Sequence, residues 1–316
     1  MISAGVEESG RRISPTFGAV VLNWNNAEDT MSCLAALVSA TPPPESIVIV
    51  DNGSEDDSLS RIERWCASSA DHNRLRVIAA GRNLGFAGGT NLGIERLMSD
   101  GAVSHIVLLN NDATVSPRFF SDVEAAIREI GRDCVIGPTI FEDPNRAKVW
   151  YAGAVEIPAR ALVQHTLTLP KTKEPRPTDF ISGCAMIIAR TVIEKIGGLA
   201  ECFFPAYFED GDFCHRALKA GFPLMYAPRP VVYHKVGATV RAAKIENPLE
   251  YSKNKLRVIY VRRNYTGARK IVALGYLAVT KPGRFLAEVA TGNSKRGWAV
   301  LRGATSGFLT RDIGSK

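Results

Sequence analysis

The sequence contains no long hydrophobic run. Nowhere in its 316 residues do about 18 apolar residues follow one another, the length that a transmembrane helix needs. Residues 1–16 are polar and have no apolar signal-peptide core, so we expect a flexible N-terminus and a cytoplasmic protein. The six cysteines form no C-x-x-C pair. Reduced thiols are therefore expected, and neither zinc nor a disulfide framework is supported.

The sequence also has no standard phosphate loop. Residues 81–94 (GRNLGFAGGTNLGI) are rich in glycine but contain neither Gly-Lys-Ser/Thr nor a well-placed G-x-G-x-x-G, so a P-loop is disfavoured. We expect these glycines to let the backbone come close to a ligand or to a neighbouring strand. A nucleotidyltransferase is a weaker alternative, because residues 23–26 (NWNN) stand where its glycine-rich loop would follow the first strand.

Charge is unevenly distributed along the chain. Residues 251–316 hold 14 Lys/Arg against Glu288 and Asp312, a net charge of +12, whereas the whole chain has +7. The rest of the chain is therefore net negative. A mildly acidic body with a basic C-terminal segment indicates an anionic partner.

The first 131 residues alternate between predicted strands and helices. Four apolar runs, each four to seven residues long, predict buried strands. Predicted helices lie between them, and a further helix follows the last run after Pro117; the runs are 17–23, 47–50, 75–79 and 106–109. This alternation predicts a parallel sheet with helices packed against it.

After Gly131 the pattern changes to shorter apolar segments. We predict short strands at 135–141, 149–157 and 162–169, with an antiparallel arrangement as one alternative. Further strands are predicted at 184–189, 223–226 and 231–234, and helices begin near Thr191 and over 213–220.

Acidic and imidazole side chains stand directly after several of these segments. Asp51 and Asp112 end two strands, Glu209 and Asp210 end an aromatic segment, and His234 ends the last strand. Ligands of open α/β sheets bind beyond the carboxyl ends of the strands. Together these residues predict a site, although each has a plain structural alternative, such as a turn or helix cap.

Seven consecutive motifs resemble one enzyme family. They are VVLNWNN (20–26), VDNGS (50–54), RNLGFAGGTNLGI (82–94), LLNNDA (108–113), SGCAMIIAR (182–190), FEDGDFCHRALKAG (208–221) and YHKVGAT (233–239). In this order they resemble the family 2 inverting glycosyltransferases of GT-A fold, bacterial rhamnosyltransferase-like branch. The resemblance implies an α/β fold of GT-A type: a Rossmann-like, mostly parallel central sheet flanked by helices, with a C-terminal helical basic extension.

The resemblance divides the chain into parts with different tasks. Residues 17–131 would be the nucleotide-sugar-binding half, and 132–247 the acceptor-binding and catalytic half of the same domain. Residues 248–316 would be the basic amphipathic helical extension.

Catalytic roles follow from the same resemblance. Asp112 and His234 would hold a divalent metal, Mg²⁺ or Mn²⁺, with Asn110 in place of the first acid of the family's D-x-D-type motif. Asp210 would be the general base, which inverting transfer needs to deprotonate the acceptor hydroxyl, with Glu209 assisting. Exchanged roles for these two acids, a structural His234 and an inactive nucleotide-sugar-binding protein are the alternatives.

Binding residues are also implied. The nucleotide-sugar site would comprise Asn23, Asn25, Asp51, Asn83, Gly85, Asn91, Asn111 and Asp112. Asp51 would accept a hydrogen bond from the imide N–H of a uracil or thymine base. The acceptor side would comprise Gly183, Cys184 and Arg263, with simple strand packing an equal alternative for the first two.

The partners expected are a dTDP- or UDP-linked sugar donor and a polyprenyl-diphosphate-linked saccharide acceptor. L-Rhamnose is the preferred sugar, with galactofuranose, glucose and N-acetylhexosamine as alternatives. Apolar residues interleaved with Lys/Arg beyond residue 270 predict helices lying on an anionic membrane surface, unless they pack on the body. No nucleic-acid-reading motif accompanies the charge, and a homo-oligomer is left open.

Overall fold

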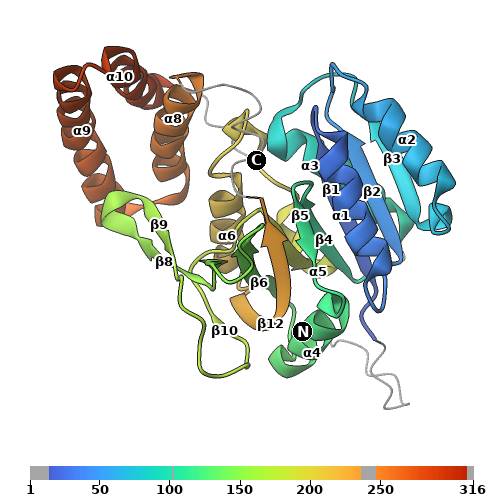
Figure 1. Cartoon of the computed structure of the whole chain (residues 1–316). Coiled ribbons are helices and arrows are strands. Elements are labelled where there is room, and N and C mark those ends of the chain that lie inside the picture. The colour runs from blue at the N-terminus through green and yellow to red at the C-terminus, as the bar shows by residue number, and fades with distance from the viewer. Residues whose placement is uncertain (1–13, 102, 236–246, 312–316) are drawn as a thin grey trace.

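The computed structural model describes residues 14–101, 103–235 and 247–311. A ten-stranded sheet runs through the body in the order β10-β12-β6-β11-β4-β1-β2-β3, with β5 paired to β12 and β7 to β6. The α8, α9 and α10 helices stand together at one end of the molecule, far from β1–β3 and α2 (Figure 1).

The N-terminal half alternates strands and helices as predicted. Its elements are β1 (Phe17–Asn23), α1 (Ala27–Ser39), β2 (Ser46–Asp51), α2 (Ser58–Ser68), β3 (Leu75–Ala79), α3 (Gly85–Asp100), β4 (His105–Asn110), β5 (Ala113–Val115) and α4 (Phe119–Ile130). The β3, β2, β1 and β4 strands are parallel neighbours, which confirms the parallel sheet. The apolar residues of β1, β2 and β4 are almost all buried, because helices cover the sheet, whereas in the edge strand β3 only Leu75 is buried.

Glycines in α3 let this helix lie close to β1. A Cβ on Gly93 would stand 2.4 Å from Cγ1 of Val20, and one on Gly89 would stand 2.4 Å from Cδ1 of Leu22. Any larger residue would push the helix off the sheet. The expected close approach to a strand is therefore confirmed.

The second half mixes strand directions. Its elements are β6 (Val135–Glu142), β7 (Val149–Tyr151), β8 (Ala154–Ile157), β9 (Leu162–His165), β10 (Arg176–Pro177), β11 (Ala185–Ala189), α5 (Arg190–Ile196), α6 (Glu209–Lys219) and β12 (Leu224–His234). The β11 strand is antiparallel to β4 and β6, whereas β12 runs parallel to β6. The β8 and β9 strands form a separate hairpin.

Several predicted boundaries in this half were wrong. The segment 149–157 is two strands, since Gly153 adopts a left-handed φ of 92° between them. The segments 223–226 and 231–234 are one strand, β12, with an irregular pairing between Ala227 and Val231. Ala189 rather than Thr191 caps α5, and α6 starts at Glu209, four residues earlier than predicted.

The basic segment forms three helices: α8 (Asn247–Asn264), α9 (Gly267–Ala290) and α10 (Ser294–Leu309). We call them the C-terminal lobe. Their inner faces build a second apolar core with Ala161, Ala200 and Phe203 of the body. In the part of the chain that is described, no helix is both long and apolar enough to span a membrane.

Candidate active site

The ends of β4 and β12 bring Asp112 and His234 together. Asp112 comes two residues after β4, and its carbonyl accepts the N–H of Lys235 at 2.9 Å. His234 ends β12 and pairs with Ala113 of β5. Oδ1 of Asp112 lies 3.1 Å from Nε2 of His234, and each residue is only 6% exposed.

This pair suits a divalent cation in its donor atoms. Nδ1 of His234 is buried without a hydrogen-bond partner, and Oδ1 of Asp112 is buried against Nε2 of His234; a buried polar atom without a partner is costly unless something else satisfies it. Adjacent ligands of an octahedral ion with bonds of about 2.1 Å stand roughly 3 Å apart, close to the 3.1 Å between Oδ1 of Asp112 and Nε2 of His234. Among the described residues no third His, Cys, Asp or Glu completes a metal cluster, so a ligand phosphate or water would supply the other positions.

The protonation of His234 depends on its neighbours. Burial lowers the pKa of His234, but the Cys184 thiol and the Asp112 carboxylate outweigh this effect and raise the pKa to about 10. The imidazole is therefore charged beside Asp112 at neutral pH while no cation is bound.

A network of polar side chains at the ends of β1 and β2 surrounds Asp51. Its Oδ1 accepts hydrogen bonds from Nδ2 of Asn23 at 2.7 Å and from the Ser54 hydroxyl at 2.5 Å, and its Oδ2 accepts from the Ser54 N–H at 3.1 Å. Asp51 is 3% exposed. It does not cap α2, whose N-cap residue is Asp57. The hydrogen bonds from Asn23 and Ser54 hold its carboxylate at the strand end.

Thr30 connects these polar side chains to Asn111, the neighbour of Asp112, and the sequence reasoning missed it. Its hydroxyl donates to Oδ1 of Asn23 at 2.7 Å and accepts from Nδ2 of Asn111 at 3.0 Å. The sequence feature that could have identified Thr30 is a polar residue on the buried face of α1, in line with Ala27, Leu34 and Leu37. Thr30 therefore makes Asp51, Asn23 and Asn111 one hydrogen-bonded unit.

Asn25, Asn83 and Gly85 lie beside the same unit. Asn25 adopts a left-handed φ of 51°, and its side-chain oxygen accepts the N–H of Glu55 at 2.8 Å. Oδ1 of Asn83 accepts the N–H of Gly85 at 2.8 Å. These contacts shape the loops around the end of β2.

Asn91 faces a different part of the molecule. Its side-chain amide donates to the carbonyl of Leu199 at 2.9 Å and to Glu201 at 3.1 Å, and its oxygen accepts the N–H of Leu199 at 2.8 Å. Asn91 therefore braces α3 against the loop after α5, and its binding role stays a prediction.

The first turn of α6 carries Glu209 and Asp210. Two aromatic residues before them, Tyr207 and Phe208, have left-handed φ angles of 88° and 76°. Such backbone strain in non-glycine residues is typical of functional sites. Oδ2 of Asp210 accepts the N–H of Gly183 at 3.1 Å, and Oδ1 accepts the N–H of Gly211 at 2.8 Å. Glu209 is 6% exposed, and its Oε2 has no hydrogen-bond partner.

The two acids have different environments. Burial and the neighbouring charge of Asp210 raise the pKa of Glu209 well above its ordinary value. Burial also raises the pKa of Asp210, but backbone N–H groups oppose that effect. A carboxylate is stabilised by hydrogen bonds to its charged form, so Asp210 is the member of the pair that holds the negative charge.

Gly183 and Cys184 join the two groups of site residues. The carbonyl of Cys184 accepts the N–H of Asn110 at 2.9 Å, two residues before Asp112. Gly183 binds Asp210 on the other side, and a Cβ on Gly183 would stand 3.4 Å from Cβ of Asp210. Hydrogen bonds of two adjacent residues, Gly183 and Cys184, thus link Asp210 to the end of β4, which carries Asp112.

Arg263 lies behind this site. Its Nε donates to Oδ1 of Asp212 at 2.7 Å, and Arg216 binds the other oxygen at 2.7 Å. Asp212 is fully buried in α6. In this structure Arg263 therefore anchors α8 to the helix of Asp210, and its acceptor-binding role stays a prediction.

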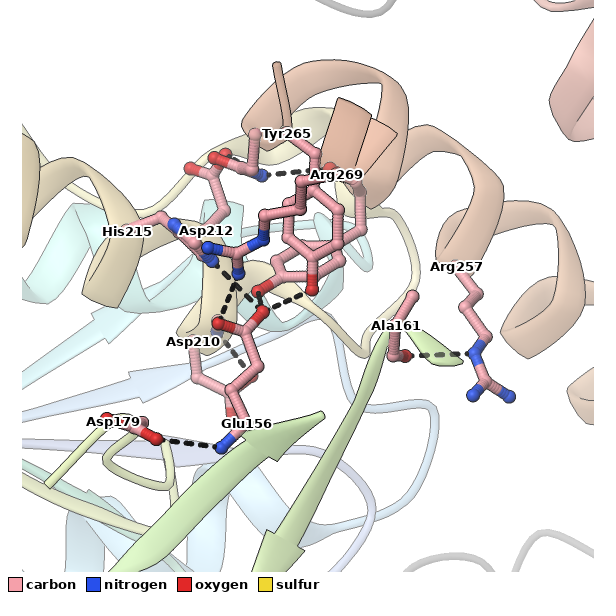
Figure 2. A network of polar contacts seen from close by, with 12 residues as sticks. Glu156, Ala161, Asp179, Asp210, Asp212, His215, Arg257, Tyr265 and Arg269 are labelled. Carbon is pink, nitrogen blue, oxygen red and sulfur yellow. Dashed lines mark hydrogen bonds and ion pairs between the residues drawn. The ribbon is translucent and has the colours of Figure 1, made fainter. Parts of the chain in front are cut away.

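Glu156 of β8 makes a second anchor, which the sequence did not suggest. Its carboxylate accepts hydrogen bonds from His215 of α6 at 3.2 Å, from Tyr260 at 3.2 Å, from Tyr265 and from Arg269 (Figure 2). Burial raises the pKa of Glu156, but these donors outweigh that effect and lower the pKa to about 2. One ionised carboxylate therefore ties α6, α8 and α9 together.

Two proteins of known name are similar to this chain in sequence. The chain is 27% identical over 206 residues to the low-salt glycan biosynthesis hexosyltransferase Agl10 of Haloferax volcanii, covering 63% of this chain and 60% of the relative. It is 28% identical over 234 residues to N-acetylglucosaminyl-diphospho-decaprenol L-rhamnosyltransferase of Mycobacterium tuberculosis, covering 66% of this chain and 72% of the relative.

A solved structure shares the fold. The mannosyltransferase PcManGT of Pyrobaculum calidifontis, in complex with GDP-Man and Mn²⁺, superposes with a TM-score of 0.56 at 15% identity, covering 95% of this chain and 89% of the other. This likeness confirms the predicted GT-A fold. The sequence pattern described as glycosyl transferase family 2 matches residues 19–197, more than half of the chain. The chain belongs to glycosyl transferase family 2.

Proposed function

We propose that this protein is an inverting glycosyltransferase that moves a sugar from a nucleotide donor to a hydroxyl of a lipid-diphosphate-linked saccharide. The observation that carries the proposal is that Gly183 and Cys184 link Asp210 to the strand end that carries the Asp112–His234 pair. That arrangement suits a leaving diphosphate at the pair and an attacking hydroxyl at Asp210.

The donor side consists of the unit built around Asp51, Asn23 and Asn111. Asp51, held at the end of β2, would accept the imide N–H of a uracil or thymine base, and Asn111 would contact the ribose or the sugar. Asp112 and His234 would hold Mg²⁺ or Mn²⁺. The cation would neutralise the charge of the departing diphosphate.

Asp210 acts on the acceptor side as the base. The acceptor oxygen attacks the anomeric carbon as the bond from that carbon to the diphosphate oxygen breaks, and the hydroxyl proton passes to the Asp210 carboxylate. Glu209, kept neutral by burial, orients the acceptor without competing for this proton.

Donor and acceptor identities rest on the relatives. The mycobacterial relative is named for L-rhamnosyl transfer to an N-acetylglucosaminyl-diphospho-decaprenol, so we propose dTDP-L-rhamnose as donor and a polyprenyl-diphosphate-linked saccharide as acceptor. The reaction would take place at the cytoplasmic face of an anionic membrane, in the synthesis of a cell-envelope polysaccharide.

A thermal-shift series tests the donor assignment. We expect dTDP-L-rhamnose with Mn²⁺ or Mg²⁺ to raise the melting temperature more than UDP-galactofuranose, UDP-glucose or UDP-N-acetylglucosamine, because a ligand at 100 times its Kd adds about 2.7 kcal/mol to stability. In Asp112→Asn the metal-dependent part of the shift should disappear. An equal shift in that variant, or no shift with any nucleotide sugar, would contradict the proposal. Donor binding without transfer or donor hydrolysis would favour an inactive nucleotide-sugar-binding protein.

A further inference from the structure

The outer face of α9 is apolar along its whole exposed length. Ile271, Val279 and Leu286 are 74%, 76% and 65% exposed, and their spacing places them on one side of the helix. The other exposed residues on this side are Val272, Gly275, Tyr276, Ala278, Pro282, Gly283, Val289 and Ala290. We call this set the α9 face. It extends over about 29 Å at 1.5 Å per residue.

Charged residues of α9 lie at one edge of this face or on the other sides of the helix. Arg269 binds Glu156 of the body, and Arg284 is within ion-pair distance of Glu250 and Glu288. Lys281 is buried against the rest of the lobe. A helix side with no charge over five turns, on a soluble body, needs a partner or a function.

The neighbouring helix extends this surface with an aromatic residue and cations. Trp298 of α10 is 47% exposed and packs on Phe285 of α9 with ring centroids 4.7 Å apart. Arg302 stands 5.4 Å from the Trp298 ring, and Lys295 is exposed near the start of α10. Tryptophan beside arginine and lysine is typical of a helix lying at a lipid headgroup layer.

A lipid surface suits the α9 face better than a protein does. Protein interfaces carry about one hydrogen bond per 100–200 Å², whereas the α9 face offers one side-chain polar group, the Tyr276 hydroxyl, to set the orientation of a partner. Binding to a bilayer requires only an apolar helix face that can be buried among the lipids, with positively charged residues beside it. Residues 251–316 have a net charge of +12, which complements anionic headgroups.

We infer that the α9 face, with Trp298 of α10, lies in the headgroup layer of an anionic lipid bilayer. The inference extends the proposed function, since it names the surface that meets the membrane of a lipid-linked acceptor. Glu156 and Asp212 tie the lobe to α6. A bilayer bound to the lobe would therefore have a fixed orientation relative to Asp210.

Vesicle sedimentation of the full chain tests this inference. We expect binding to vesicles of phosphatidylcholine with phosphatidylglycerol, weaker binding to phosphatidylcholine alone, and loss of binding as NaCl is raised. The double variant Ile271→Ser with Val279→Ser should need at least tenfold more lipid for half-maximal binding. Because both side chains are mostly exposed, the variant should keep the wild-type melting temperature.

A matched control uses exposed leucines outside the lobe. Leu167 and Leu169 are 60% and 47% exposed, and their double change to serine should leave vesicle binding unchanged. Equal binding by the α9 variant and the wild type, or no wild-type binding to anionic vesicles, would overturn the inference. So would a wild-type dimer that the α9 variant converts to a monomer, since the α9 face would then be a contact between copies.

The outcome is separable from that of the proposed function. Vesicle binding requires no donor or acceptor, and the donor-induced thermal shift requires no lipid. Failure of one measurement therefore leaves the other standing. The α9 variant should still show the wild-type shift with nucleotide sugar and metal.

Discussion

At the scale of single residues, Asp210 and Glu209 are adjacent acids with unlike surroundings, and we propose different tasks for them. Asp210 accepts backbone N–H groups that stabilise its charge, whereas Glu209 has a buried oxygen without a donor. We expect Asp210→Asn to lower kcat by about 10²–10⁴-fold, the usual contribution of a general base. Glu209→Gln keeps a neutral side chain of the same shape, so its kcat should fall less than tenfold.

Initial rates of sugar transfer measure both variants, and the donor-induced thermal shift shows that each still binds its donor. A larger loss in Glu209→Gln than in Asp210→Asn would reverse the two roles.

Lys281 lowers the stability of the lobe at neutral pH. Burial, together with the neighbouring Arg257 and Arg284, lowers the pKa of Lys281 to about 8. The unfolded chain keeps the proton up to its ordinary pKa near 10.5, so charging this group in the folded protein costs on the order of 3 kcal/mol below pH 8. As the pH rises from 8 towards 10.5, the folded protein loses the proton and the cost declines.

Lys281→Met removes that charge with a side chain of similar length. We expect its free energy of unfolding at pH 7 to exceed that of the wild type by about 1–3 kcal/mol, and the difference to shrink by pH 10. Urea denaturation at the two pH values measures both quantities. A variant less stable than the wild type at pH 7 would show that the lysine makes a favourable interaction.

At the scale of secondary-structure elements, glycine has opposite effects in α3 and α9. Gly93 faces Val20 of β1 with no room for a Cβ, whereas a Cβ on Gly275 in α9 would meet no atom within 4 Å. Gly93→Ala should lower the free energy of unfolding by about 1–3 kcal/mol through overpacking. Gly275→Ala should raise it by about 0.5–1 kcal/mol, the usual gain of alanine inside a helix.

Chemical denaturation of both variants against the wild type gives the comparison. If Gly93→Ala were neutral, α3 would not lie as close to the sheet as the structure places it.

At the scale of the whole molecule, sequence patterns predicted what depends on local periodicity. The parallel half of the sheet and the strand-end position of Asp112 follow from apolar runs that end in polar residues. Contacts between distant segments have no such pattern. Thr30 and Glu156 look like ordinary helix and hairpin residues, and only the folded chain brings them to Asn111 and Tyr265. The split at Gly153 was missed for a related reason, because the left-handed backbone there depends on its tertiary surroundings.

Glu156 is also the residue that joins the lobe to the body. Its pKa of about 2 lies below the ordinary value of 4.5, so its ionised form stabilises the fold above pH 4.5. This contribution declines as the pH falls from 4.5 towards 2. Glu156→Gln should remove it at neutral pH and cost about 2–4 kcal/mol, because Arg269 and His215 lose their anionic partner.

Hydrogen exchange localises the effect of this change. We expect faster exchange at pH 7 in α6, α8 and α9 of Glu156→Gln, with β1 and β2 unchanged, since the carboxylate binds residues of these three helices and Tyr265 between α8 and α9. Glu174→Gln, at an exposed glutamate of the loop before β10, is the matched control and should exchange like the wild type. Faster exchange confined to α9 would mean that the contacts of Asp212 with Arg263 and Asn264 suffice to hold α8 to the helix of Asp210.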